Sequence, residues 1–482
     1  MDINEFKNVK NQRKTDYDYV MSRKSEIIKA ALGLDYDQFE FPGIGFDYES
    51  MMEKAGYSLE EVIKIQNQTN VGNTPMIEVN NINLLVKKLS KPGYGAKILI
   101  KDEAANPSGS FKDRRASVSV YHAKKLGYKG VIAATSGNYG AAVASQANKR
   151  RLKCIIVQET YDSRGFGQPE IIEKGRVCEA YGAEVHQLTV GPELFYVFLL
   201  LLEETGYFNA SLYTPFGVAG IETLGHEVAM DVKSKFGKFP EVVVVTHAGG
   251  GNVTGTARGF LKEGATNTEI IAASVDLKGL HMASDLDFNR KSFTTGHTGF
   301  GFPFAVWPDR ADVPRNAARA LRYMDRYVTV TQGEVFYATE MLAQLEGIER
   351  GPAGNCSLAA AISIAQQMPD DNIIVVQETE YTGAGKHPTA QLTFAKKQGI
   401  EIYRGDPEEN IPGRRIVIPE HPNQIKAKEV NLDRIRKSYL RNTLEKNKIK
   451  PQDLTEKDIN FLTEETNTNV NYVKELLKEF EE

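Results

Sequence analysis

The sequence predicts an α/β protein whose mainly parallel sheets are flanked by helices, with a helical leader before them and a helical extension after them. From residue 96 onward, short β-branched runs alternate with helical patterns, and this alternation is typical of parallel sheets covered by helices. Both ends of the chain are polar and carry helical patterns. The chain has 482 residues, enough for two or three domains around sizeable cores.

The expected elements follow in chain order. In the leader, SEIIKAALGL is the clearest amphipathic helix. The expected strands are AKILIKDE, GVIAAT, KCIIVQE, EVVVVT, EIIAASV and NIIVVQE, and the expected helices between them include AAVASQANKR and TGTARGFLKEG. After about residue 415 the pattern changes to charged helix, with helix starts at Thr455 and near Asn469. This tail would suit a helix-turn-helix, but its acidic character favours a helical appendage that packs on a neighbour or a partner.

Composition excludes several classes of protein. The chain is 41% hydrophobic and 25% charged, as in ordinary globular proteins, and its net charge of −4 gives no support for a nucleic-acid-binding face. The charged N-terminus lacks the apolar core of a signal peptide, and the longest apolar run, LFYVFLLLL, is too short to span a bilayer. We therefore expect a cytoplasmic protein that binds neither membranes nor nucleic acid. The spacing of Cys154, Cys178 and Cys356 predicts no disulfide frame and no metal site.

The segment NPSGSFKDRR places Lys112 in the first turn of a predicted helix. Ser110 and Asp113 have the S-x-x-D spacing that opens a helix, and the periodic run that follows ends at Gly127. The first turn of a helix carries partial positive charge, so it is an unfavourable place for a charged lysine.

This placement suggests a chemical use for Lys112. The helix dipole, together with Arg114 and Arg115, is expected to lower the pKa of Lys112, and a neutral amine can attack an aldehyde to form a Schiff base. A solvated surface lysine is the alternative, and the segment alone fits the two interpretations about equally.

The segment THAGGGNVTGT lies between a predicted strand and a predicted helix. Gly249, Gly250 and Gly251 allow the backbone to fold closely around a ligand, and their amides with the helix N-terminus make a phosphate cradle. A dinucleotide site is a weaker interpretation, because the spacing is not G-x-G-x-x-G and no acidic ribose partner is evident. A tight turn without a ligand is also less favoured, because three consecutive glycines end the strand.

A second loop of the same kind, ATSGNYGAA, predicts a site for a carboxylate. Thr135, Ser136, Asn138 and Tyr139, through side chains and local amides, are the candidates, and the Asn138 amide can also donate to a phenolate. In isolation, a cluster that only caps the helix would be the better interpretation.

The segment QETEYTGAGKHPT is not a nucleotide-binding loop, because Lys386 is followed by His387 and not by Ser or Thr. Thr382 at this strand end can supply a hydroxyl to a ring nitrogen, with Thr379 and the nearby glutamates as alternatives. Together these segments indicate one cofactor, pyridoxal 5'-phosphate. They offer a lysine with a lowered pKa, a glycine loop for a phosphate, a loop for a carboxylate and a hydroxyl for a ring nitrogen.

Five motifs in order, VGNTP, NPSGSFKDR, ATSGNYG, EAYGAEV and GGGN, resemble the fold type II pyridoxal phosphate enzymes of the tryptophan synthase β superfamily, and threonine synthases most of all. The likeness covers roughly residues 70 to 400. It implies two domains, each with a mainly parallel sheet flanked by helices. The expected segments are a leader (1–70), a large cofactor-binding domain (71–104 and 211–415), a small domain (105–210) and an extension (416–482).

The resemblance also implies roles for single residues. Lys112 would bind the cofactor covalently and act as the catalytic residue. Asn138 would contact the phenolic oxygen, and Thr382 the pyridine nitrogen. The phosphate would lie on the glycine loop, formed by Gly249, Gly250, Gly251 and Asn252. That loop departs from threonine synthases, which usually have G-N-A-G-N where this chain has AGGGN.

The double arginine of FKDRRAS, the long polar leader and the charged tail are similar to a narrower family, the β subunits of 2-amino-4-oxopentanoate thiolases. This likeness implies cleavage of a small 2-amino-4-oxo acid by coenzyme A to acetyl-CoA and alanine in ornithine degradation, with a small α subunit as partner and a homodimerised β subunit. Freed Lys112 would then remove the Cα proton, and no protein cysteine would be needed. The alternatives are a threonine-synthase-like replacement or elimination and a non-catalytic binding protein.

Overall fold

The computed structural model describes residues 15–135, 137–161, 165, 167, 169–277, 280–281, 293–294, 305–306, 312–381 and 388–480. The helices in these ranges are α2 (Tyr17–Ser22), α3 (Lys24–Leu32), α4 (Tyr48–Lys54), α5 (Leu59–Asn67), α6 (Asn80–Leu89), α7 (Lys112–Lys125), α8 (Asn138–Lys149), α9 (Pro169–Ala180), α10 (Glu193–Thr205), α11 (Pro215–Phe236), α12 (Gly251–Lys262), α13 (Ala320–Tyr323), α14 (Gln332–Glu346), α15 (Pro352–Ala365), α16 (Pro388–Lys397), α17 (Leu432–Asn447), α18 (Glu456–Glu465) and α19 (Val470–Glu479). The strands are β1 (Met76–Glu78), β2 (Lys97–Asp102), β3 (Gly130–Thr135), β4 (Lys153–Tyr161), β5 (Glu184–Thr189), β6 (Phe208–Asn209), β7 (Val242–Thr246), β8 (Glu269–Leu277), β9 (Leu280–His281), β10 (Phe293–Thr294), β11 (Ala305–Val306), β12 (Arg326–Val330), β13 (Ile373–Glu378), β14 (Glu401–Gly405), β15 (Arg415–Pro419) and β16 (Lys428–Glu429).

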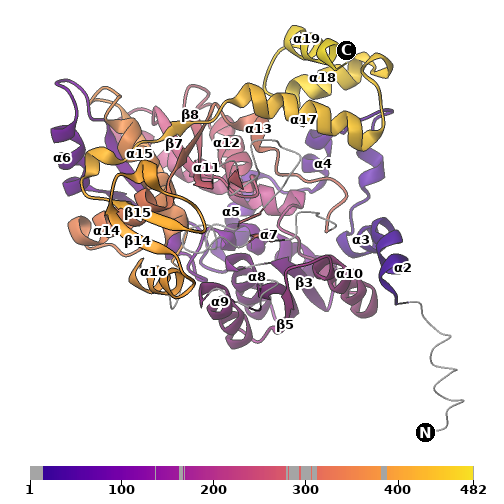
Figure 1. Ribbon diagram of the computed structural model, residues 1–482. Helices are drawn as coiled ribbons and strands as arrows, with labels where there is room; N and C mark the ends of the chain where they lie inside the picture. Colours follow the sequence, from indigo (N-terminus) through magenta and orange to yellow (C-terminus); the bar gives the residue numbers. More distant parts are fainter. Residues whose placement is uncertain are drawn as a thin grey trace, which may run out of the picture.

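The larger sheet has the strand order β1-β2-β13-β7-β8-β12-β16 (Figure 1). Its five central strands are parallel, and the short strands at the two ends, β1 and β16, are antiparallel to their neighbours. Because parallel strands present their carboxyl ends at the same edge, the loops after β2, β7 and β13 lie at one edge of the sheet. The lysine segment, the glycine loop and the QETEYT segment follow these three strands.

Helices cover both faces of this sheet. Along β7, Val242 and Val244 pack in a core with α14 and α15, whereas Val243 and Val245 pack in a core with α11 and α12. Successive side chains of a strand point to opposite faces, so an almost continuously apolar strand is what a sheet covered on both sides requires. The predicted α/β class is confirmed.

The smaller sheet is wholly parallel, in the order β5-β4-β3-β6. Its core includes apolar residues of α7, α8 and α10 and of the leader helix α3. All six strands expected from the sequence are present, but β5, β6 and β12 were not among those predicted. The strands of residues 130–209 share this sheet. Most strands on either side of them share the larger one, but β10 pairs with β11 and β14 with β15 in separate two-stranded sheets. Both β15 and β16 extend beyond residue 415. The domain boundaries themselves stay a prediction.

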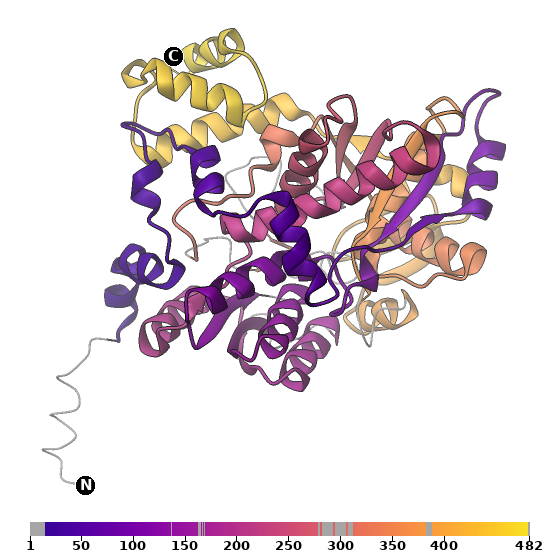
Figure 2. The same ribbon diagram turned by 180° about the vertical axis from the view of Figure 1, so that it is seen from behind.

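The leader and the C-terminal extension meet each other, although they lie at opposite ends of the chain (Figure 2). The Ile44 amide donates to Asp458 Oδ1 at 2.9 Å, and the rings of Tyr48 and Phe461 stack with centroids 6.4 Å apart. The predicted helix starts are confirmed, because Thr455 caps α18 and Asn469 caps α19. The extension is not helical from residue 415, since β15 and β16 precede α17.

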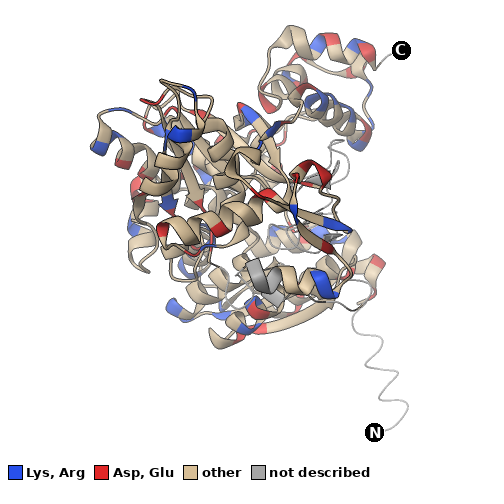
Figure 3. Cartoon of the chain, turned by 60° about the vertical axis from the view of Figure 1, so that its left-hand side comes forward, with Lys and Arg blue, Asp and Glu red and all other residues tan. Residues whose placement is uncertain are grey.

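Basic and acidic residues are interspersed along the helices and strands of the chain (Figure 3). Within the described ranges, no helix combines the length and the apolar character that crossing a membrane would need.

Candidate active site

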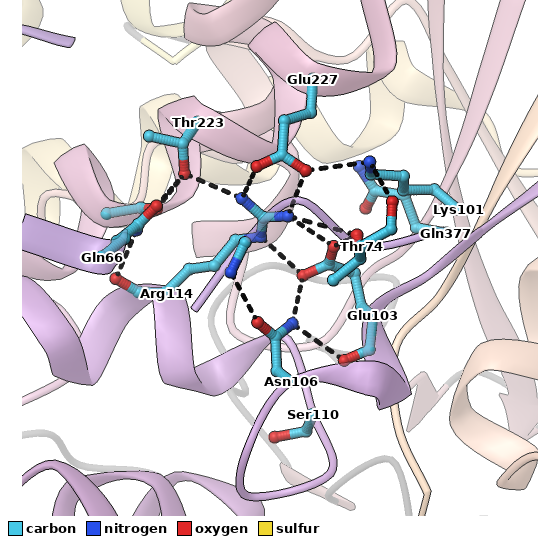
Figure 4. A network of polar contacts seen from close by, with 12 residues as sticks. Gln66, Thr74, Lys101, Glu103, Asn106, Ser110, Arg114, Thr223, Glu227 and Gln377 are labelled. Carbon is cyan, nitrogen blue, oxygen red and sulfur yellow. Dashed lines mark hydrogen bonds and ion pairs between the residues drawn. The ribbon is translucent and has the colours of Figure 1, made fainter. Parts of the chain in front are cut away.

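A buried ion-pair network around Arg114 lies next to the loop that carries Asn106 and Ser110 (Figure 4). This loop leads to Lys112. All three guanidinium nitrogens donate: to Glu103 at 2.6 and 2.7 Å, to Glu227 at 2.8 Å twice, and to Thr223 at 3.0 Å. Lys101 adds a second cation at 2.9 Å from Glu227. Burial alone would raise the pKa of Glu227, but Arg114 and Lys101 lower that pKa well below its ordinary value.

This network corrects one step of the sequence argument. Arg114 was expected to add positive charge beside Lys112, yet its side chain is fully buried between two carboxylates. The positive charge of Arg114 is therefore compensated, and this residue anchors the loop to the core. The signal that the sequence offered was Glu103 at the end of a predicted strand, but the partnership with Glu227 depends on how α11 packs on α7.

The VGNTP and NPSGS motifs meet through the same network. The Gly72 amide donates to Asn106 Oδ1 at 3.0 Å, and the Thr74 hydroxyl donates to Glu103 Oε1 at 2.6 Å. Gly72 has φ 84°, a conformation that favours glycine. The two motifs thus build one rigid support under the lysine loop.

Lys112 is the first residue of α7, so its predicted place in the first turn is confirmed. The predicted cap is wrong: the N-cap is Phe111, whose side chain makes no capping bond, and the Asp113 carboxylate instead accepts from the Ser108 amide at 2.6 Å. The Lys112 ammonium lies 4.6 Å from the centre of the Phe111 ring. Burial raises the pKa of Asp113 to about 6, against the effect of the Ser108 hydrogen bond.

A short backbone pairing brings the QETEYT segment beside the lysine. The Phe111 amide donates to the Thr379 carbonyl at 3.0 Å, and the Tyr381 amide donates to the Gly109 carbonyl at 2.7 Å. This long-range pairing replaces the local cap that the sequence suggested. Thr382, the predicted partner of the ring nitrogen, lies outside the described residues, and its role stays a prediction.

Two glutamates at this strand end are buried, Glu378 and Glu380. A Cβ placed on Gly354 would lie 1.9 Å from Glu378 Oε1, and one on Gly351 would lie 1.9 Å from Glu380 Oε1, so both carboxyls pack against the first turn of α15. Burial raises the pKa of Glu378 well above its ordinary value, and Glu380 and Asp102 raise it further. Such a perturbed carboxyl beside a lysine loop marks a functional site.

The carboxylate loop lies beside the same strand end. Asn138 opens α8, and its side-chain amide donates to Glu380 Oε2 at 3.1 Å, so two of the predicted segments touch directly. The Thr135 hydroxyl accepts from the Gly137 amide at 3.2 Å. The Tyr139 hydroxyl points into the small-sheet core and donates to the Ala210 carbonyl at 2.7 Å, so only its backbone amide is left for a carboxylate. Ser136 lies outside the described residues.

The glycine loop opens α12 as predicted, with Gly250 in the left-handed region at φ 83°. Side chains press directly on it: a Cβ on Gly249 would lie 1.8 Å from the Tyr213 hydroxyl, and one on Gly251 would lie 1.9 Å from Arg115 Nη2. A side chain at either position would therefore have to displace the end of the Tyr213 or the Arg115 side chain. The loop presents backbone amides at a helix N-terminus with a buried guanidinium beside them.

Asn252 completes this cradle. Its side chain is 5% exposed, and its amide nitrogen Nδ2 has no hydrogen-bond partner among the described residues. A buried donor without an acceptor is costly, and a phosphate oxygen at this loop would satisfy it. The residues present therefore fit the phosphate group of the expected cofactor.

The cysteines are unreactive in this fold. All three are buried, and burial raises the pKa of Cys178 to about 12 and that of Cys154 higher still. Cys356 is completely buried within α15, and burial raises its thiol pKa far above the ordinary value.

Comparisons with known proteins agree with this geometry. The profile of the family described as pyridoxal-phosphate dependent enzyme matches residues 68–379. The chain is 69% identical over 96% of its length to a 2-amino-4-ketopentanoate thiolase beta subunit from an unknown prokaryotic organism, covering 98% of that protein. It is 64% identical, over 96% of its length and 98% of the relative, to a protein of the same name from Acetoanaerobium sticklandii. Among solved structures, a threonine deaminase from T.th. superposes with a TM-score of 0.53 at 22% identity, covering 67% of this chain and 98% of that one.

Proposed function

The chain belongs to the pyridoxal-phosphate-dependent enzyme family, and from this premise we propose that it catalyses the thiolytic cleavage of 2-amino-4-oxopentanoate by coenzyme A. The observation that carries this proposal is the extent of the likeness to the two thiolase β subunits, which includes the leader and the extension as well as the catalytic core. The names of these two relatives use 2-amino-4-ketopentanoate, which is another name for 2-amino-4-oxopentanoate.

The reaction balances without an added oxidant or reductant. The thiol sulfur bonds to C4 of the substrate while the C3–C4 bond breaks, and C3 takes a proton, so the products are acetyl-CoA and alanine. Bound pyridoxal phosphate supplies an electron sink for the electron pair released at Cα. A coenzyme thiol as nucleophile explains why the three buried cysteines need no reactive environment.

We assign the following roles to the chain's own residues. Lys112 would hold the cofactor, and its Nζ would move the Cα proton of the substrate. The amides of Gly249 to Gly251 and the Asn252 side chain bind the phosphate, and Asn138 binds the phenolic oxygen. The loop of Thr135 to Tyr139 orients the substrate carboxylate. For the contact with the pyridine nitrogen we assign Thr382 as the first candidate and the buried carboxyl of Glu378 as the second.

The threonine-synthase-like alternative loses one of its two candidate residues. A replacement reaction on a phosphorylated amino acid needs a second anion pocket, for which the sequence offers Arg114 or Arg115. The donors of Arg114 are already taken by Glu103, Glu227 and Thr223, so this arginine cannot receive a substrate phosphate.

A product assay tests the proposed function. The relatives are called beta subunits, so we propose a small α subunit as partner, a paired β subunit and a cytoplasmic site of action. Co-expressed with the small subunit, the chain should form acetyl-CoA and alanine in equal amounts from 2-amino-4-oxopentanoate and coenzyme A. Turnover of O-phosphohomoserine to threonine, without acetyl-CoA from the oxo acid, would favour the alternative instead.

A further inference from the structure

A cavity of about 250 Å³ lies between the glycine loop and the C-terminal extension. Gly249 and Gly250 form one wall, with Tyr213 beside them. The opposite walls come from Tyr48 of the leader helix α4 and from Thr443 of α17. The cavity therefore joins the predicted phosphate cradle to two segments that lie outside the catalytic core.

These two segments separate this chain from the wider family. The family profile ends at residue 379 and begins at residue 68, so it includes neither α4 nor α17 and α18. The thiolase β subunits, in contrast, match the chain over 96% of its length. The cavity walls that the leader and the extension form therefore lie in segments that the thiolases share with this chain. A thiolase differs from the other members of this family in its cosubstrate, which is a thiol.

We propose that this cavity binds the pantetheine arm of coenzyme A, with the phosphates at its outer end; this rests on the proposed function. The volume is below the roughly 300 to 1,000 Å³ of pockets that enclose a whole drug-sized ligand, so the cavity takes the narrow arm and leaves the nucleotide outside.

The walls suit an uncharged arm with two amide groups. The cation of Arg319 inside the cavity is already paired with Glu465 and lies 4.1 Å from the centre of the Tyr48 ring. The positive charge of Arg319 is therefore compensated by Glu465 inside the cavity. Asn442 lines the cavity, and its side chain makes no hydrogen bond with any described residue, so it is available to a ligand amide.

The outer end suits phosphates. Lys446 lines the cavity from the last turn of α17, and it is exposed, which places it at the open end. It forms no ion pair within the described part of the chain. An exposed, unpaired ammonium at the mouth of an otherwise charge-balanced cavity is a recognition group for an anion.

One end of the cavity reaches the glycine loop, where Gly249 and Gly250 line it. The Tyr213 hydroxyl lies against Gly249, and the guanidinium of Arg115 lies 5.8 Å from the centre of the Tyr213 ring and also against Gly251. Arg115 is one helical turn after Lys112 on α7. An arm that enters past α17 would therefore extend toward the loop that we assign to the cofactor phosphate.

Two variants of α17 test this assignment in the holoenzyme with its small subunit. Thr443→Trp fills the cavity, and its matched control is Glu445→Trp, an exposed residue of the same helix that does not line it. Lys446→Glu reverses the charge at the mouth, with Arg434→Glu as control. The measurements are the KM for coenzyme A and for free pantetheine, calorimetric binding of coenzyme A, and exchange of the alanine Cα proton with solvent, which requires no thiol.

Thr443→Trp should raise the KM for both thiols about tenfold or more, a loss of about 1.4 kcal/mol, and leave Cα proton exchange unchanged. Lys446→Glu should weaken coenzyme A but not pantetheine. A folded, cofactor-loaded Thr443→Trp enzyme with an unchanged KM for coenzyme A would overturn the assignment, as would equal effects of Lys446→Glu on the two thiols. Failure of the unaltered enzyme to make acetyl-CoA would instead overturn the proposed function.

Discussion

Arg114 and Glu103 form a fully buried, two-point ion pair, with Nε and Nη2 donating to the two carboxylate oxygens at 2.6 and 2.7 Å. This pair ties the end of β2 to the helix that carries Lys112, and Glu227 closes it from the other side. Arg114 is therefore the residue through which the position of Lys112 depends on the core.

Breaking this pair should destabilise the protein severely. Glu103→Gln leaves a buried guanidinium with one carboxylate partner fewer, and loss of a single partner of a buried pair costs about 3 to 5 kcal/mol. Urea unfolding of the apoprotein measures this cost. The exposed pair of Arg415 and Glu401 is the control, and Glu401→Gln should cost less than about 1 kcal/mol. Similar costs for the two variants would show that Arg114 is no anchor.

Lys112→Ala should fold and lose the covalent attachment of the cofactor. The reason is position, because Lys112 opens α7 beside the paired segments of residues 109–111 and 379–381. Borohydride reduction followed by peptide mass mapping reads this directly. Lys125→Ala, at the other end of α7, should keep the cofactor on the Lys112 peptide. Reduction that still fixes the cofactor to Lys112→Ala would move the assignment to another lysine.

Asn252→Asp should weaken the binding of pyridoxal phosphate by about tenfold or more, because it replaces a buried donor with an anion that faces the phosphate. Pyridoxal, which has no phosphate, should bind the variant and the unaltered chain alike. Titration of the apoprotein with both compounds separates the two effects, and the exposed Asn267→Asp is the control. An equal loss for pyridoxal would place the phosphate elsewhere.

The buried carboxyl of Asp113 should make stability fall as the pH rises. Its pKa is raised by burial from 3.8 to about 6 in the folded state, so the folded protein holds the proton more tightly than the unfolded chain does. The stabilisation is complete below pH 3.8 and is lost as the pH passes about 6, a difference of about 3 kcal/mol.

Asp113→Asn removes that titration while it keeps an acceptor for the Ser108 amide. The unfolding free energy of the variant, minus that of the unaltered chain, should therefore increase between pH 4 and 6 and stay level above it. The exposed Asp453→Asn is the control for the substitution itself. A flat difference for Asp113→Asn would contradict the raised pKa.

Cys356→Ala should retain thiolytic activity, although the chain loses a buried sulfur and about 1 kcal/mol of packing. Complete burial raises the thiol pKa of Cys356 and prevents contact with a substrate. Acetyl-CoA formation is the measurement. A folded, cofactor-loaded variant that makes none, or an acetylated Cys356 peptide trapped during turnover, would indicate a two-step thiolase.

Local patterns predicted the catalytic elements well, because the strands concerned are apolar on both faces. GVIAAT and EVVVVT correspond to β3 and β7, and the lysine, asparagine and glycine motifs each open the helix expected of them. The misses depend on long-range contacts. The two residues of β6 form a strand only because β3 lies beside them, and the cap at Ser110 is replaced by pairing with a segment 270 residues away. Neither is visible in a local window of sequence.

The contact between Ile44 and Asp458 has a consequence for synthesis. The two residues are separated by 414 positions. The Ile44 amide therefore cannot form its hydrogen bond with the Asp458 carboxylate until residue 458 has been translated. At about 5 to 20 residues per second, this interval is roughly 20 to 80 s. During this interval, the apolar side chain of Ile44 cannot yet pack in the core that it forms with the C-terminal helices. A nascent chain held at the ribosome before residue 458 should thus present this segment to chaperones and proteases, and the finished chain should conceal it.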